Sequence, residues 1–242
     1  MKASWIITAS LLVGLSLLAE PVDYAVDQAH DQLDTVEDIH SLIAYPTITQ
    51  EFTPTHRALN VVEIYTRDWS SPTINGVGGT LQVTIREDTT NGTVLAVSEP
   101  LELPDGWEGL SRFNFPELIW LTPGNRYAIE VRLLAGNNWG VDSYGEFAPP
   151  YAGGRYFVGP HLVTSADMWF RTGVRPPATK LKLESERVIA WPGIRPLPYR
   201  VWLSTTLTNW QLAGIIQSTA DTYRFTNAVS TAPKVFFKVS QP

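Results

Sequence analysis

Apolar and polar residues alternate along much of this chain, which is the pattern of half-buried β-strands. The segment 80–87 reads TLQVTIRE and the segment 127–133 reads YAIEVRL, so every second residue in each is apolar. Shorter β-rich runs occur elsewhere, at 59–65, 94–97, 112–115 and 168–170. No convincing long helix separates them, and the pattern therefore predicts antiparallel sheets.

Turn-forming residues separate these runs at intervals of about ten residues. Asn91–Gly92 predicts a tight hairpin turn, because both residues tolerate a positive φ. Thr122-Pro-Gly-Asn125 predicts a second turn, with proline suited to its second position and glycine to its third. Only the segment 22–44 is ambiguous, because its apolar residues fall near helical spacing but β-branched residues are frequent and no strong helix cap appears.

A second, smaller group of strands follows Arg175-Pro-Pro177, a stiff linker. The runs 188–191, 199–203, 223–226 and 235–239 fit a small β-domain whose core is filled by aromatic residues. The sequence therefore predicts an all-β protein with a jelly-roll-like antiparallel β-sandwich followed by a small sandwich-like domain. The boundaries are 22–174 for the sandwich, 175–178 for the Pro-rich linker and 179–242 for the C-terminal domain.

The first nineteen residues are expected to be a cleaved signal peptide. Lys2 precedes an uncharged apolar stretch, 5–18, which is short for a membrane span, and Ala19 precedes Glu20-Pro21 as a small residue before the cut. A buried N-terminal helix or an uncleaved anchor is the alternative. We expect a secreted, periplasmic or cell-surface protein with no membrane insertion after cleavage.

Composition and charge narrow the function classes. The chain has no cysteine, so a disulfide framework, a cysteine metal site and a thiol nucleophile are excluded. Eight acidic and no basic residues occur in 20–51, whereas 176–242 holds eight basic and three acidic residues. The acidic segment 20–51 argues against a nucleic-acid partner, which requires a basic surface.

Several short motifs occur in the order of a known kind of module. They are QEFTPT (50–55), LNVVEIY (59–65), GTLQVTIR (79–86), LTPGNRY (121–127), NWG (138–140), YAGG (151–154) and DMWFRT (167–172). Together they resemble secreted bacterial jelly-roll modules of the carbohydrate-binding-like or choice-of-anchor type. The run STTLTNW (204–210) with the closing FFKV (236–239) looks like a short C-terminal β-module of verrucomicrobial and planctomycete exported proteins. The resemblance implies an extracellular location and a non-catalytic role, and it carries over no defined binding residues.

Motifs for catalysis or metal binding are weak. The four histidines lack metal-ligand spacing and are expected in exposed loops. No GxSxG string occurs, and the acidic run 99–108 is expected to be a loop because prolines and a glycine interrupt it. A glycosidase needs two carboxyl groups facing each other across a cleft, which makes an enzyme the least favoured function. No cofactor is expected. Structural calcium is the one alternative, with Asp27, Asp31 and Asp34, or Asp142, as candidate ligands.

The best candidate site is the aromatic, Gly/Pro-rich segment 137–156. Sugar rings stack their apolar faces on Trp and Tyr, and amides and charged groups beside the rings bind the hydroxyls. The candidate ligand-binding residues are Trp139, Tyr144, Tyr151, Tyr156, Asn138, Asp142 and Arg155. The alternative is that these rings pack in the core.

The sequence thus favours a non-catalytic extracellular binding module whose partner is an extracellular glycan or an envelope component, with carbohydrate as the preferred ligand. A structural or adhesive exported protein that binds the envelope or other proteins through its sheet edges or its terminal module is the alternative.

Overall fold

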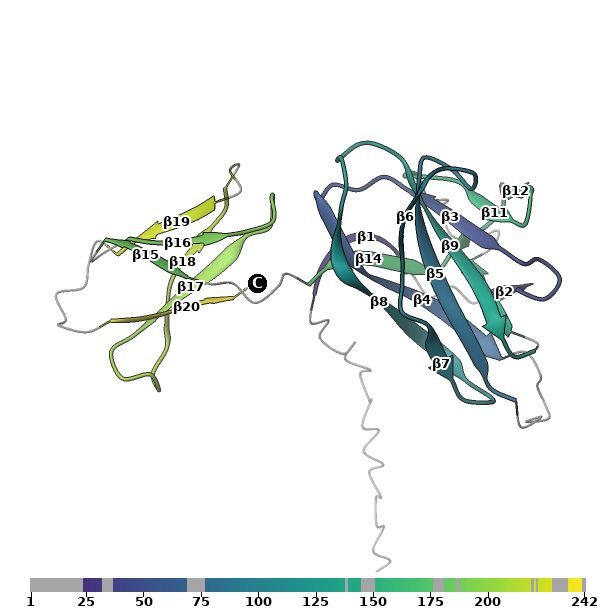
Figure 1. Ribbon diagram of the computed structural model, residues 1–242, viewed down its shortest axis with the longest axis horizontal. Helices are drawn as coiled ribbons and strands as arrows, with labels where there is room; N and C mark the ends of the chain where they lie inside the picture. The colour runs from purple at the N-terminus through teal and green to yellow at the C-terminus, as the bar shows by residue number, and fades with distance from the viewer. Residues whose placement is uncertain are drawn as a thin grey trace, which may run out of the picture.

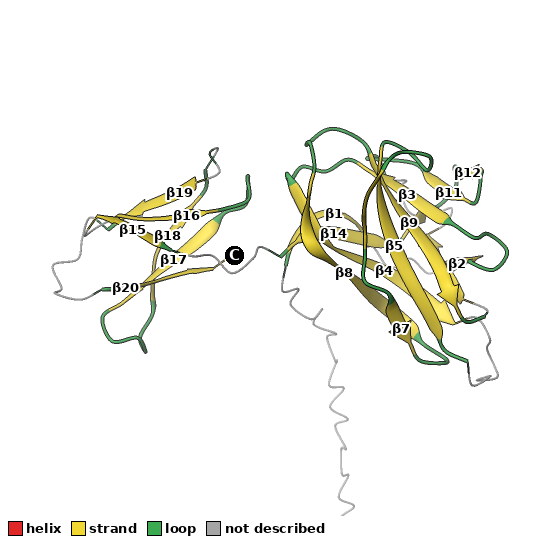
Figure 2. Cartoon of the chain, viewed as in Figure 1, coloured by secondary structure: helices red, strands yellow, loops and turns green. Residues whose placement is uncertain are grey.

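The computed structural model describes residues 24–31, 37–68, 77–137, 139–144, 151–175, 181–185, 188–218, 220, 222–227 and 235–240. For residues 37, 38, 142–144 and 185 it describes the backbone alone. The expected signal peptide and most of the expected linker lie outside these residues. The described chain consists of strands and loops without a helix, as Figure 2 shows, and every strand pair is antiparallel, so the all-β prediction is confirmed.

Two seven-stranded sheets are built from the residues up to Val174 (Figure 1). The first sheet has the order β1-β14-β4-β10-β13, with β2 beside β10 and β8 beside β4. Its strands are β1 (Ala25–His30), β2 (Glu37–Ser41), β4 (Ala58–Asp68), β8 (Glu108–Trp120), β10 (Trp139–Tyr144), β13 (Asp167–Met168) and β14 (Phe170–Val174).

The second sheet has the order β12-β11-β3-β9-β5-β6, with β7 beside β5. Its strands are β3 (Ile48–Phe52), β5 (Gly79–Glu87), β6 (Val94–Val97), β7 (Leu101–Leu103), β9 (Tyr127–Ala135), β11 (Tyr156–Val158) and β12 (His161–Val163). Alternate residues of both sheets, such as Val62 and Ile64 in β4 and Val83 and Ile85 in β5, are fully buried and fill the core between the sheets.

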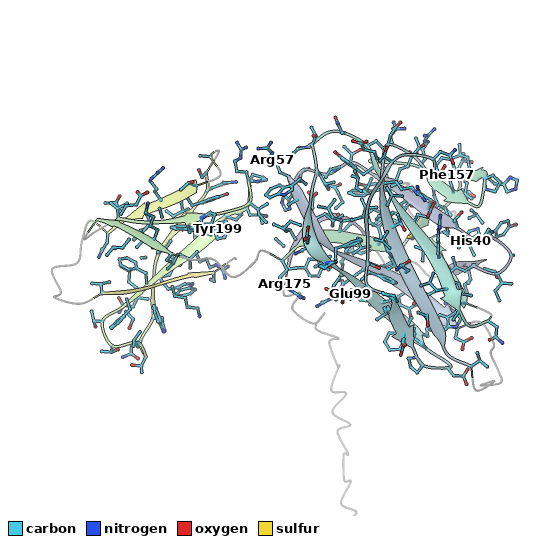
Figure 3. The ribbon with its side chains drawn as sticks, viewed as in Figure 1. His40, Arg57, Glu99, Phe157, Arg175 and Tyr199 are labelled. Carbon is cyan, nitrogen blue, oxygen red and sulfur yellow. The ribbon has the colours of Figure 1, made fainter. Side chains whose placement is uncertain are left out.

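Six further strands form two three-stranded sheets, ordered β15-β16-β19 and β18-β17-β20. They are β15 (Lys182–Ser185), β16 (Val188–Pro192), β17 (Tyr199–Ser204), β18 (Gln211–Ile216), β19 (Thr222–Thr226) and β20 (Phe236–Ser240). Trp191, Tyr199 and Tyr223 pack ring against ring at their centre, with centroids 4.7–6.0 Å apart. Figure 3 shows Tyr199 between these strands, and the same buried cluster includes Ala58 and Val174 from the first sheet.

The ambiguous N-terminal segment forms strands at 25–30 and 37–41, and a turn follows from Leu42. β1 pairs with β14, matching Ala25 to Val174, and β2 pairs with β10, matching Ile39 to Asp142. Backbone hydrogen bonds to β14 and β10, strands about 100 or more residues away, determine its structure. The helical spacing of its apolar residues does not.

One predicted turn is confirmed and the other is different. The 122–125 turn forms as expected, with Asn125 N donating to Thr122 O at 3.1 Å and Gly124 at a φ of 83°. The hairpin between β5 and β6 is a longer loop than the two-residue turn predicted at Asn91–Gly92. Its positive-φ residue is Asp88, at 61°.

Candidate functional site

An open polar cleft of about 520 Å³ lies at one end of the second sheet. The residues lining it are Thr53, Glu87, Asp88, Gly124, Asn125, Arg126 and Tyr127. They come from three loops, which meet because antiparallel strands place the end of one strand beside the start of the next. In particular, Glu87 at the end of β5 pairs with Tyr127 at the start of β9.

Backbone hydrogen bonds tie these loops together. Asp88 N donates to Arg126 O at 3.0 Å, and Gly124 N donates to Pro54 O at 3.0 Å. Asp88 lies in the left-handed region, which few non-glycine residues adopt and which Asp tolerates better than most. The cleft is therefore a fixed feature of the sheet end, and a binding site on a rigid scaffold is a common use of such loops.

A buried carboxylate organises the cations beside the cleft. Glu51 on β3 is fully buried and accepts two hydrogen bonds of 2.8 Å from Arg155, while Arg126 Nη1 lies 3.5 Å from Glu51 Oε2. The hydrogen bond to Glu51 raises the pKa of Arg155, and the charge of Asp88 adds to that effect. Both guanidinium groups stay nearly half exposed, at 45% for Arg126 and 46% for Arg155, and that of Arg155 lies 5.3 Å from the ring centre of Phe157.

The cleft thus offers carboxylates, a guanidinium group, an amide and a hydroxyl within one small open volume. Such a set donates and accepts hydrogen bonds at once, which suits a ligand rich in hydroxyl groups. Glu87 and Asp88 are consecutive residues on one wall and both are exposed, whereas glycoside hydrolysis requires carboxyl groups on either side of the bond that is cleaved. The arrangement favours binding.

Two of the aromatic residues predicted as ligand contacts are core residues instead. Trp139 and Tyr156 have no exposed surface. The Trp139 indole lies against Gly79 and Gly136, where any side chain would collide with it or with the neighbouring backbone. Tyr156 packs on His40, with its hydroxyl 3.1 Å from His40 Nδ1. Neither ring has a face open to a sugar, so the prediction is corrected for both.

Tyr151 is half-buried and held by its own contacts. Its hydroxyl donates to Gln28 Oε1 at 2.8 Å, its amide donates to Asp167 Oδ2 at 2.9 Å, and its ring meets Phe170 edge-on at 5.1 Å. Burial raises the pKa of Tyr151 to about 12. The Tyr151 ring therefore packs against the first sheet at this end of the sandwich.

Among the predicted ligand-binding residues whose side chains the structure describes, Arg155 lies by the cleft. Asn138 and the side chains of Asp142 and Tyr144 lie outside the described residues. Of the turns beside the cleft, the sequence predicted the one at 122–125, whereas it placed the hairpin turn at Asn91–Gly92 and not at Asp88, which lines the cleft. What it could not show is that β5 and β9 are neighbours, which brings the turns together.

The calcium candidates that are described have protein partners. Asp27 accepts hydrogen bonds from the backbone N–H groups of Thr55 and His56, and Asp31 Oδ2 lies 2.6 Å from Arg171 Nε. Asp34 lies outside the described residues. Within the described part of the chain, no three His, Asp or Glu residues gather as a metal site would require.

Known proteins give no further guidance to this site, because no family model and no curated protein matches the chain. Among the described residues there is also no helix with the length and hydropathy to cross a membrane.

Proposed function

We propose that this protein is a non-catalytic extracellular carbohydrate-binding module and that the cleft bounded by Thr53, Asp88, Asn125 and Arg126 holds the sugar. The observation that carries the proposal is the meeting of three loops around an open volume of about 520 Å³ with paired hydrogen-bond donors and acceptors. Recognition rests on hydroxyl contacts more than on ring stacking, because Tyr127, the aromatic residue in the lining, is 4% exposed.

Affinity electrophoresis of the protein against a panel of neutral polysaccharides tests this proposal. One glycan class is expected to retard the protein, and Asp88→Gly and Asn125→Ala are expected to weaken binding about tenfold each, the effect of losing one good hydrogen bond. Asp88→Gly keeps the positive φ and removes the carboxylate, so a loss of binding reports the side chain.

Glu102→Gln is the matched control, since Glu102 is an exposed carboxylate on β7 of the same sheet, away from the cleft. Retardation that persists in the Asp88 and Asn125 variants would contradict the cleft as the site. If it were abolished by Tyr144→Ala instead, the aromatic segment predicted from the sequence would be the site.

One observation favours an adhesive role as a second candidate. β6 lies at the edge of the second sheet and exposes Val94, Leu95 and Val97 by 46%, 37% and 42%, with no charged residue in the strand. An unprotected apolar edge is a template for pairing with a strand from another protein. Light scattering measures whether the chain self-associates, and capture of partner proteins measures whether Leu95→Lys weakens binding. A monomeric chain whose partner capture is unchanged by Leu95→Lys would rule against this role.

A further inference from the structure

The outward face of the sheet β18-β17-β20 combines an indole, two cations and exposed aliphatic side chains. Tyr199, Val201 and Val239 pack inward, so Arg200, Trp202 and Lys238 project from the other side. Leu212 and Ile215 on β18 lie beside Trp202 and Arg200 and are 49% and 59% exposed. We call this set, together with Ser240, the β17 face.

Trp202 is held across the sheet. Its partner in the register on β20 is Lys238, yet its Nε1 donates to Ser240 Oγ, two residues further along that strand, at 3.0 Å. That hydrogen bond turns the indole over β20 and fixes it there. A ring held along a flat sheet presents a face on which a sugar ring can stack.

The cations of this face differ from those of the large sandwich. There, arginines are bound to carboxylates, as Arg86 and Arg132 are to Glu130 and as Arg112 is to Glu63. Arg200 and Lys238 have no ion-pair partner among the described residues, so their charge is available to a ligand. Arg224 on the opposite sheet of the same unit is, by contrast, paired with Glu184 at 3.0 Å.

We propose that the β17 face is a second binding site and that it takes an acidic polysaccharide. The indole of Trp202 stacks on a sugar ring, Arg200 and Lys238 pair with its carboxylates or sulfates, and Leu212 and Ile215 cover the apolar edge. Charge complementarity decides the occupant, because residues 176–242 carry eight basic and three acidic residues in an otherwise acidic chain. Two cations beside a single aromatic ring match the one acidic group of a sugar ring. Nucleic acids and lipid surfaces carry densely spaced phosphates, which need more cations than this face has.

Affinity electrophoresis in gels that contain polygalacturonate, with dextran gels as the neutral reference, tests the site with the full chain. Polygalacturonate is expected to retard the protein at low ionic strength, and salt at about 0.5 M is expected to weaken the retardation because it screens exposed charges. Arg200→Gln with Lys238→Gln is expected to weaken binding at least about tenfold, a loss equal to one or two charged hydrogen bonds. Trp202→Leu is expected to weaken the binding to polygalacturonate that persists at high salt.

The matched control is Lys182→Gln with Arg224→Gln, which removes the same charge from the opposite sheet. An equal loss in this control would overturn the site, because it would show a general effect of charge. Absence of retardation by polygalacturonate at low salt would overturn the proposal, as would binding only to phosphatidylglycerol vesicles or to oligo(dT). Circular dichroism of each variant shows that the fold is kept.

This site and the cleft are tested separately. Asp88→Gly is expected to leave polygalacturonate binding unchanged, and the Arg200/Lys238 variant is expected to leave neutral glycan binding unchanged. Failure of either proposal therefore leaves the other standing.

Discussion

At the residue scale, three buried glutamates of the large sandwich act as structural anchors. Glu51, Glu63 and Glu130 lie on the outward sides of their sheets yet are at most 4% exposed, because arginine side chains cover them. Each carboxylate meets two guanidinium groups, and Glu63 also accepts a hydrogen bond of 2.7 Å from Tyr24. Such pairs contribute little net stability when intact, but they are costly to break.

The Glu63 cluster is expected to show this cost. Glu63→Gln leaves Arg112 and Arg171 without their shared carboxylate and is expected to lower the free energy of unfolding by about 3 kcal/mol, measured by urea denaturation. Glu108→Gln on β8 is the control, since Glu108 is 51% exposed and its pair with Arg67 spans 3.7 Å, and it is expected to cost less than about 1 kcal/mol. Equal effects of the two substitutions would contradict the anchoring role.

Two histidines are expected to make stability depend on pH. His30 and His56, predicted as exposed loop residues, are half-buried, and burial lowers the pKa of each below 6.5, opposed for His30 by Asp167 and Asp31 and for His56 by Asp27. As pH falls below 6.5, these histidines are therefore protonated in the unfolded chain before they are protonated in the folded protein. Their contribution to the free energy of unfolding is complete above pH 6.5 and is lost as pH drops from 6.5 through the folded pKa values. Melting temperatures of His30→Gln/His56→Gln should fall less over this range, while His161→Gln, at an exposed position, should follow the unmodified protein.

At the element scale, the sequence predicted strands wherever one face is buried and the other exposed. The alternating segments 80–87 and 127–133 match β5 and β9 closely, because each strand carries its own burial pattern. The unpredicted features depend on partners far along the chain: β1 and β2 need β14 and β10, and the burial of Trp139 needs the bare backbone of Gly79. The cleft has the same origin, since the turn at 122–125 is readable in the sequence but its contact with the loop after β5 is not.

The turn between β16 and β17 depends on a residue of β19. The Tyr223 hydroxyl donates to Leu197 O at 2.9 Å, with Ile194 O also within 3.2 Å, so one side chain bonds this buried turn. Tyr223→Phe is expected to cost about 1–2 kcal/mol in urea unfolding followed by near-UV circular dichroism, because the freed carbonyl groups stay buried. Tyr65→Phe removes a long, exposed contact of 3.5 Å to Glu108 and is expected to change little. A Tyr223→Phe protein as stable as the unmodified one would show that water reaches the turn.

At the scale of the whole molecule, the two groups of sheets share buried surface. Ala58 and Val174, from β4 and β14, belong to the same apolar cluster as Trp191 and Leu197, and Arg57 N donates to Arg195 O at 3.4 Å. Figure 3 shows Arg57 at the side of the large sandwich nearest the smaller sheets. The small sheets thus complete their core against the large ones, which suits a unit near the lower size limit for independent stability.

This shared cluster predicts coupled unfolding. The unmodified protein is expected to melt in a single calorimetric transition, and Ala58→Asp is expected to split it into two, with the smaller sheets melting first, because a carboxylate placed at a 1% exposed position lacks a partner. Ala29→Asp is the control, since Ala29 lies exposed on β1, and it should keep one transition. Two transitions in the unmodified protein would contradict the coupling.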